Sequence, residues 1–188
     1  MIRKLLRLLP LPVKRFGKRI LGDRFQNDGG INDADFDVIR KDIDRVRPSV
    51  FIEIGTGVGI SARKIFAYLK AQGRPFDFYS IDIFKGHLKV ANAAMPDANF
   101  HPVWGLSVTV DETDEPARST LAGYDGPQNV LRNIINTDLA GKTVDIAFID
   151  SAKGSALPEF KVLAEHMTPN GAIFCHDITN GDKGVEVL

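Results

Sequence analysis

A short segment in the first third of the chain, residues 50–61, limits most strongly what this chain can fold into. It begins with Val50-Phe51-Ile52-Glu53-Ile54, and four of these five residues are apolar, which is typical of a strand buried on both faces of a parallel sheet. Three alternating glycines follow, and a helical pattern begins at Ser61. Glycine lets the backbone approach a ligand closely, and a helix N-terminus favours negative charge. The segment therefore predicts a strand, a tight turn and a helix that together bind a nucleotide-type ligand.

The spacing of the glycines separates this loop from the dinucleotide-binding fingerprint. That fingerprint places its third glycine three residues after the second, where the helix packs closely on the strand. Here that place is Ile60, and the third glycine comes earlier, at Gly59. The pattern is acid-x-Gly-x-Gly-x-Gly, with Glu53 as the acid near the end of the strand. A nicotinamide-dependent oxidoreductase would use the same fold, but this spacing argues against it.

Apolar runs and amphipathic helical patterns alternate along the rest of the chain. The patterns predict further strands over 76–83, 100–106, 144–149 and 172–175, and helices over 33–47, 61–70, 87–94, 129–139 and 157–167. This alternation predicts an α/β fold: a Rossmann-like, doubly wound, mainly parallel sheet with helices on both faces. Residues 107–127 have no clean period. We interpret them as a lid or substrate loop, with a disordered insertion as the alternative.

Polar residues mark the carboxyl ends of the predicted strands. They are Glu53 with Gly55, then Asp82, Asp150, and His176 with Asp177. Ligands of open α/β sheets bind outside these strand ends, so we expect one shared pocket. Asp82 suits a ribose because a carboxylate accepts hydrogen bonds from both hydroxyls. Taken alone, its position would equally allow a turn or helix-cap carboxylate.

Composition gives broad limits on compartment and partner. The 188 residues carry 24 basic and 24 acidic side chains, so the formal net charge of zero does not indicate nucleic acid. The apolar content of 44% is typical of a soluble globular protein, and no apolar run approaches the roughly 18 residues that span a bilayer. The single cysteine, Cys175, excludes an internal disulfide and fits a reducing compartment. We therefore expect a cytoplasmic protein.

The zero net charge hides a basic N-terminus. Residues 1–22 contain seven Lys or Arg and no acid, and leucines lie between the basic residues. A basic amphipathic segment can lie on an anionic membrane surface, and packing on its own domain or on a partner is the equal alternative. We assign residues 1–24 to a basic amphipathic leader and residues 25–188 to the domain, with peripheral membrane contact through residues 1–22.

The motifs together resemble the class I S-adenosylmethionine-dependent methyltransferases. Within that class the chain is similar to the catechol and caffeoyl-coenzyme A O-methyltransferase branch over roughly residues 35–180. The glycine segment matches the first motif of that branch, Asp82 matches its ribose-binding acid, and Asp150-Ser-Ala-Lys153 matches its Asp-x-x-Lys motif. The resemblance implies that S-adenosylmethionine is held by Glu53, Gly55, Thr56, Gly57, Gly59, Ser61, Asp82 and Asp150. Ser61 would meet the carboxylate of the cofactor.

The same resemblance implies methylation of a small-molecule hydroxyl. That hydroxyl must lose its proton, and the residues placed to act as general base are Lys153 and His176. An exposed loop lysine and a hydrogen-bonded strand-end histidine are the corresponding structural interpretations. Asp150 and Asp177 fall at the two metal-binding aspartates of the branch.

The chain departs from the branch in two places. The asparagine that should complete the metal site is replaced by Ile178, so we expect weak Mg²⁺ binding at most. Only 11 residues follow Asp177, too few for the two strands that complete the sheet of the family, so we expect a C-terminally short sheet. The chain is then a fragment, a short natural variant, or a homo-oligomer that pairs its sheet edge. A cofactor-binding domain without catalysis, acting in a larger assembly, is the alternative function.

Overall fold

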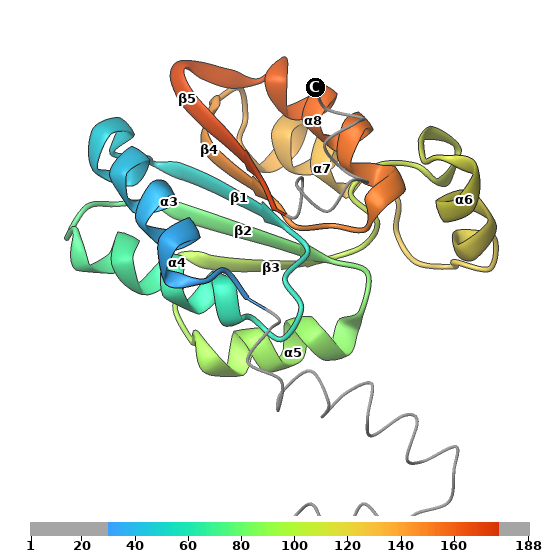
Figure 1. The fold of residues 1–188 in the computed structure, drawn as a ribbon, viewed down its shortest axis with the longest axis horizontal. Helices are drawn as coiled ribbons and strands as arrows, with labels where there is room; N and C mark the ends of the chain where they lie inside the picture. The colour runs from blue at the N-terminus through green and yellow to red at the C-terminus, as the bar shows by residue number, and fades with distance from the viewer. Residues whose placement is uncertain (1–29, 177–188) are drawn as a thin grey trace, which may run out of the picture.

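The computed structural model describes residues 30–176, in which five parallel strands form one sheet in the order β3-β2-β1-β4-β5. The strands are β1 (Val50–Ile54), β2 (Asp77–Asp82), β3 (Phe100–Trp104), β4 (Val144–Ile149) and β5 (Met167–Cys175). The first strand, β1, lies in the middle of the sheet; the next two strands are added outward to β3, and the chain then crosses back to place β4 on the other side of β1 (Figure 1). The strand order therefore reverses between β1 and β4. This is the expected doubly wound α/β fold, and it is confirmed.

Helices cover both faces of the sheet (Figure 1). They are α3 (Asp33–Val46), α4 (Ile60–Ala71), α5 (Lys85–Ala94), α6 (Glu115–Leu121), α7 (Val130–Asn133), which continues as a π-helical turn (Ile134–Asp138), and α8 (Ala156–Ala164). One core cluster joins α3, α4 and α5 to Phe51 of β1, and the other joins α7 and α8 to Ile52 and Ile54. Successive residues of β1 thus alternate between two apolar layers, which explains why all five are buried.

The segment expected to be a lid or substrate loop contains ordered structure. A short 3₁₀ turn (Val110–Glu112) precedes α6, and the Asp114 side chain caps that helix by accepting from Ala117 N at 2.8 Å. Pro116 in the first helical turn needs no hydrogen bond there, and it fixes a helical backbone angle. The alternative of a disordered insertion is therefore wrong. Because α6 buries no residue completely, its sequence has no apolar period that predicts a helix.

The last strand is longer than expected. Residues 157–167 were expected to be helical, but α8 ends at Ala164 and β5 begins at Met167. The register between β4 and β5 shifts between Val144 and Ile146, so that residues 168–171 of β5 form an irregular bulge. Their sequence, Thr-Pro-Asn-Gly, has the composition of a turn and conceals the strand.

Several expectations concern residues outside the described range of 30–176. These are the leader, residues 1–24, and the second predicted metal ligand, Asp177. Among the residues that the structure describes, no helix has both the length and the apolar composition for a membrane span.

Candidate functional site

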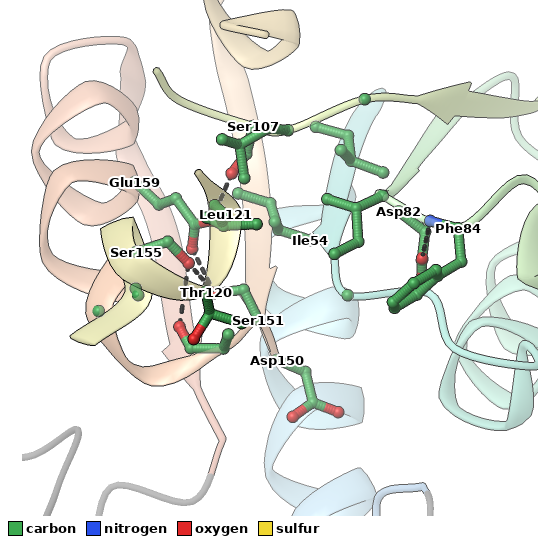
Figure 2. Close-up of a pocket in the computed structure, with 18 of the residues that line it drawn as sticks. Ile54, Asp82, Phe84, Ser107, Thr120, Leu121, Asp150, Ser151, Ser155 and Glu159 are labelled. Carbon is green, nitrogen blue, oxygen red and sulfur yellow. Dashed lines mark hydrogen bonds between the residues drawn. The ribbon is translucent and has the colours of Figure 1, made fainter. Parts of the chain in front are cut away.

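A cavity of about 620 Å³ lies at the carboxyl ends of β1, β2 and β4. Its walls come from the loop after β1, the ends of β2 and β3, helix α6, and the segment between β4 and α8 (Figure 2). Its volume is typical of a small-molecule site, and its position is where doubly wound sheets bind ligands. The backbone of Asp114 fixes one wall by donating to Gly154 O at 3.0 Å, which joins α6 to the segment before α8.

Two positions of the loop after β1, Gly55 and Gly57, require glycine for different reasons. Gly55 has φ of 98°, and a Cβ added there would lie 2.3 Å from the backbone oxygen of Asp150. Gly57 has φ of 51°, lines the cavity, and a Cβ there would meet nothing within 4 Å. Gly55 therefore allows close packing of β1 on the segment after β4. Gly57 leaves open space at the cavity wall, where a ligand can approach the backbone.

Asp82, the predicted ribose ligand, lines the cavity and is held by backbone amides. Its Oδ2 accepts from Gly57 N at 2.8 Å, and its Oδ1 accepts from Phe84 N at 2.7 Å. The Nδ1 atom of His87 lies 3.2 Å from Oδ2. The Asp82 side chain is therefore fixed in one orientation at the end of β2 (Figure 2). Its own hydrogen bonds tie it to the glycine loop that the sequence predicts as its neighbour.

Glu53 lies beneath the glycine loop and does not line the cavity. It is fully buried, and Ser80 Oγ donates to its Oε2 at 2.5 Å. The pKa of Glu53 is raised to about 8: burial is the main cause, the Ser80 hydrogen bond opposes it, and the nearby carboxylates of Asp150 and Asp82 add to it. Its Oε1 has no hydrogen-bond partner among the described residues. Because buried polar atoms are normally hydrogen-bonded, the partner of this oxygen must come from outside the described residues, for example from a ligand or water.

The remaining loop residues of the prediction lie away from the cavity wall. Thr56 is buried, and its Oγ1 lies 2.7 Å from Ser80 Oγ. Ser61, in the first turn of α4, accepts from Ile31 N at 3.0 Å. Gly59 immediately precedes α4 as its N-cap. None of the three lines the cavity, so the described cavity covers only one side of the predicted cofactor site.

The predicted catalytic and metal residues lie around the ends of β4 and β5. Asp150 lines the cavity, and its Oδ1 lies 3.1 Å from Nδ1 of His176. His176 does not line the cavity, and its Nε2 lies 3.7 Å from Asp35 Oδ2 on α3. The backbone of Lys153 begins a short 3₁₀ turn (Lys153–Ser155) before α8, and its side chain is not described. Within residues 30–176, no group of three His, Cys, Asp or Glu side chains is arranged to hold a metal ion.

A buried polar cluster that the sequence analysis missed forms another part of the cavity wall. Ser107 Oγ donates to Glu159 Oε1, and Ser151 Oγ donates to Glu159 Oε2 at 2.5 Å (Figure 2). Glu159 is only 1% exposed, yet it lines the cavity. A signal for it exists in the sequence, because Glu159 shares the inward face of α8 with Ala156, Val162 and Leu163. A charged residue in an apolar helical stripe is rarely buried without a partner or a function.

The comparison with protein families identifies the class of protein. Residues 52–178 match a family model described as a methyltransferase domain, and this range covers more than half of the chain. The chain therefore belongs to this methyltransferase family, which confirms the expectation from its motifs. None of the curated proteins matches the sequence.

Solved structures share the fold at low sequence identity. An O-methyltransferase from Bacillus cereus in complex with S-adenosylhomocysteine has a TM-score of 0.61 and 13% identity, covering 92% of this chain and 69% of that one. The O-methyltransferase TomG from Streptomyces achromogenes, in complex with S-adenosylmethionine, has a TM-score of 0.57 and 14% identity, covering 92% and 68%. A protein described as a caffeoyl-CoA O-methyltransferase from Staphylococcus aureus has a TM-score of 0.56 and 15% identity, covering 95% and 73%. These similarities show the methyltransferase fold.

Proposed function

We propose that this chain is an S-adenosylmethionine-dependent methyltransferase that methylates a hydroxyl group of a small molecule. The observation that carries this proposal is the pairing of Gly57 with Asp82. Gly57 leaves open space at the cavity wall, and its amide holds the Asp82 carboxylate at the same place. An open backbone beside a fixed carboxylate suits a ribose with two hydroxyl donors. Membership of a methyltransferase family and the fold shared with cofactor-bound O-methyltransferases support the same function.

The residues around the loop fit the parts of this cofactor. Asp82 would accept from the ribose hydroxyls, and Phe84, which is 47% exposed beside the cavity, offers an apolar ring to the base. The Ser61 hydroxyl already accepts from Ile31 N, so its own proton is available for a carboxylate at the N-terminus of α4. The bound cofactor supplies a methyl group that its sulfonium has already activated. The protein therefore has to align the acceptor oxygen and exclude water.

Removing the acceptor proton is the remaining task, and we propose Lys153 or His176 as the base. Asp150 orients the His176 ring through the contact at 3.1 Å. We propose that Mg²⁺ binds weakly at most at Asp150 and Asp177. Mg²⁺ takes about six oxygen ligands. Here Asp150 contacts the imidazole of His176, and the position of the third side-chain ligand in the related O-methyltransferases holds Ile178, which has no side-chain oxygen. Proton transfer to Lys153 or His176 does not need the metal.

Binding measurements on the purified chain test this function. S-adenosylhomocysteine should bind and raise the melting temperature, and Asp82→Ala should weaken that binding by about 1–3 kcal/mol because ribose hydroxyls lose their acceptor. Asp77→Ala is a matched control: it removes a carboxylate from the other end of β2, where Asp77 contacts His101 at 2.8 Å. It should leave the affinity unchanged. Tighter binding of NAD than of either methionine-derived cofactor would refute the proposal.

We also propose that residues 1–24 form a leader separable from the domain of a cytoplasmic protein. The seven basic residues of the first 22 are the supporting observation. A chain lacking residues 1–22 should bind S-adenosylhomocysteine as the full chain does, while sedimenting less with anionic vesicles. Loss of folding on truncation would instead assign these residues to the domain.

A further inference from the structure

The cavity has two polar ends, and only one of them has a role in the proposed function. Figure 2 shows Asp82 and Phe84 on one side of Ile54, and Ser107, Ser151 and Glu159 on the other side. Both groups line the same cavity, although β2 supplies the first and α8 with two loops supplies the second. A ligand that fills the cavity therefore contacts both ends.

The position of Asp82 decides which part of the cofactor reaches the second end. The ribose lies between the amino-acid tail and the adenine of S-adenosylmethionine. In the proposed function the tail points to the N-terminus of α4, and Thr56, Gly59 and Ser61 on that side do not line the cavity. The cavity therefore extends from the ribose site toward the adenine. Its walls include the apolar side chains of Leu106 and Leu121, which suit the faces of a base, and Leu121 lies on the same side of Ile54 as Glu159 (Figure 2).

Glu159 has the hydrogen-bonding chemistry that the edge of adenine requires. Two serine hydroxyls donate to it, so its oxygens act as acceptors. A carboxylate offers about four acceptor positions and can serve the serines and a ligand together. The exocyclic amino group of adenine is a donor. Burying a carboxylate on the inward face of a helix is costly, so a packing role alone would favour an apolar residue at this position.

We propose that Glu159 accepts a hydrogen bond from the adenine amino group and thereby selects adenosine-type cofactors, with Ser107 and Ser151 as positioning residues. This inference rests on the proposed function, because it needs the ribose at Asp82. The serines fix the carboxylate from opposite sides: Ser107 lies 52 residues before Glu159 on the loop after β3, and Ser151 lies 8 residues before it.

The experiment compares two ligands that differ at this amino group and at the neighbouring N1, which carries a proton only in the inosine compound. S-inosylhomocysteine carries a carbonyl oxygen where S-adenosylhomocysteine carries the amino group. The wild-type chain should bind the adenosyl compound roughly 10- to 100-fold more tightly, because a carbonyl beside Glu159 leaves two acceptors facing each other. Glu159→Gln presents an amide that donates as well as accepts, so it should reduce the ratio to roughly threefold or less. Titration calorimetry measures both affinities.

Two further variants separate recognition from structure. Ser151→Ala removes a hydroxyl that orients Glu159 and should lower the same ratio by roughly threefold. Ser49→Ala is the control: its hydroxyl also donates to a carboxylate, Asp145 Oδ2 at 2.9 Å, but it lies before β1 at the opposite end of the sheet and does not line the cavity. It should leave the ratio unchanged.

The outcomes distinguish this inference from the function on which it rests. Equal wild-type affinity for the two ligands, or an equal loss of both affinities in Glu159→Gln, would overturn the role of Glu159 while leaving the methyltransferase proposal intact. If neither ligand binds the wild-type chain, the proposed function itself fails. Should Glu159→Gln not fold, the wild-type ratio and Ser151→Ala still decide the question.

Discussion

The two ends of the cavity are held together by different kinds of contact, backbone at one end and side chain at the other. At the end near β2, backbone groups make the decisive contacts: Gly55 N and Thr56 N both donate to Ile81 O, and Gly57 N donates to Asp82. At the end near α8, side chains make them, with serine hydroxyls holding Glu159. A backbone-built end cannot change without disturbing the sheet, whereas a side-chain-built end can change one ligand contact at a time. We therefore expect substitutions that disturb backbone packing near β2 to affect folding, and side-chain substitutions near α8 to affect specificity.

The largest effect should come from Gly55, the position where the loop packs most closely on the sheet. Gly55→Ala forces a non-glycine residue to φ of 98° and places its Cβ 2.3 Å from Asp150 O. It should reduce the free energy of unfolding by more than about 3 kcal/mol, measured by urea denaturation. Gly57→Ala is the matched variant because its Cβ meets nothing within 4 Å. It should cost only about 1–2 kcal/mol, since left-handed backbone strain is the main penalty, and should weaken S-adenosylhomocysteine binding instead.

Equal destabilisation by the two alanines would contradict this division of roles. It would mean that loop conformation alone, and not the contact with Asp150 or the space at the cavity, requires both glycines.

A smaller effect, on the rate of the reaction, should come from the residues at the ends of β4 and β5. His176→Ala should lower kcat roughly 100-fold if His176 is the base, and should leave the KM for the cofactor unchanged because His176 does not line the cavity. Lys153→Ala gives the equivalent result if Lys153 is the base. Asp35→Asn is the control: the Asp35 side chain is 45% exposed and its Oδ2 lies 3.7 Å from His176 Nε2, so losing this charge should change the rate by roughly twofold or less.

The same assay tests the metal. A chelator should slow the reaction only modestly, because the proposed proton transfer uses Lys153 or His176. Complete loss of activity with chelator, restored by Mg²⁺, would show that Ile178 does not weaken the metal site and that the metal is essential.

The end of the cavity near β2 could be predicted from the sequence because its parts are local or follow from the sheet. The strand, three glycines and helix start lie within residues 50–61, and Asp82 ends the next strand of the sheet. Parallel strands bring their carboxyl ends to one edge, so the rule that places Asp82 beside Gly57 needs no knowledge of side-chain packing.

The end near α8 could not be predicted in the same way. Ser107 and Glu159 are separated by 52 residues, and neither belongs to a motif. Helix α6 escaped prediction because its stability comes from the Asp114 cap and the Asp114–Gly154 backbone contact, and these leave no apolar stripe in the sequence. For Thr56 and Ser61 the sequence predicts more than the structure shows. The motif predicts that they bind the cofactor, whereas the structure shows their contacts with Ser80 and Ile31 but not the ligand.

The last effect depends on pH and concerns Glu53, which lies beneath the glycine loop. Its pKa is raised, mainly by burial, to about 8 from an ordinary value of 4.5. Below pH 4.5 both the folded and the unfolded chain hold this proton. Between pH 4.5 and about 8 the folded chain keeps the proton while the unfolded chain releases it, so stability falls as the pH rises. The expected slope is roughly 1.4 kcal/mol per pH unit, and it ends above the folded pKa, where both states are ionised.

Urea unfolding across this pH range, on wild type and on Glu53→Gln, measures that slope. The glutamine keeps the shape of the side chain without a titrating proton, so the difference between the two proteins should change steadily from about pH 5 to about pH 8. Ser80→Ala removes the hydrogen bond that lowers the pKa of Glu53, so in that variant the falling part of the curve should extend to higher pH. Parallel curves for wild type and Glu53→Gln would show that Glu53 is already ionised in the folded protein. A buried charge would then lie beneath the glycine loop, and Glu53 Oε1, which has no hydrogen-bond partner within residues 30–176, would attract the positively charged part of a ligand.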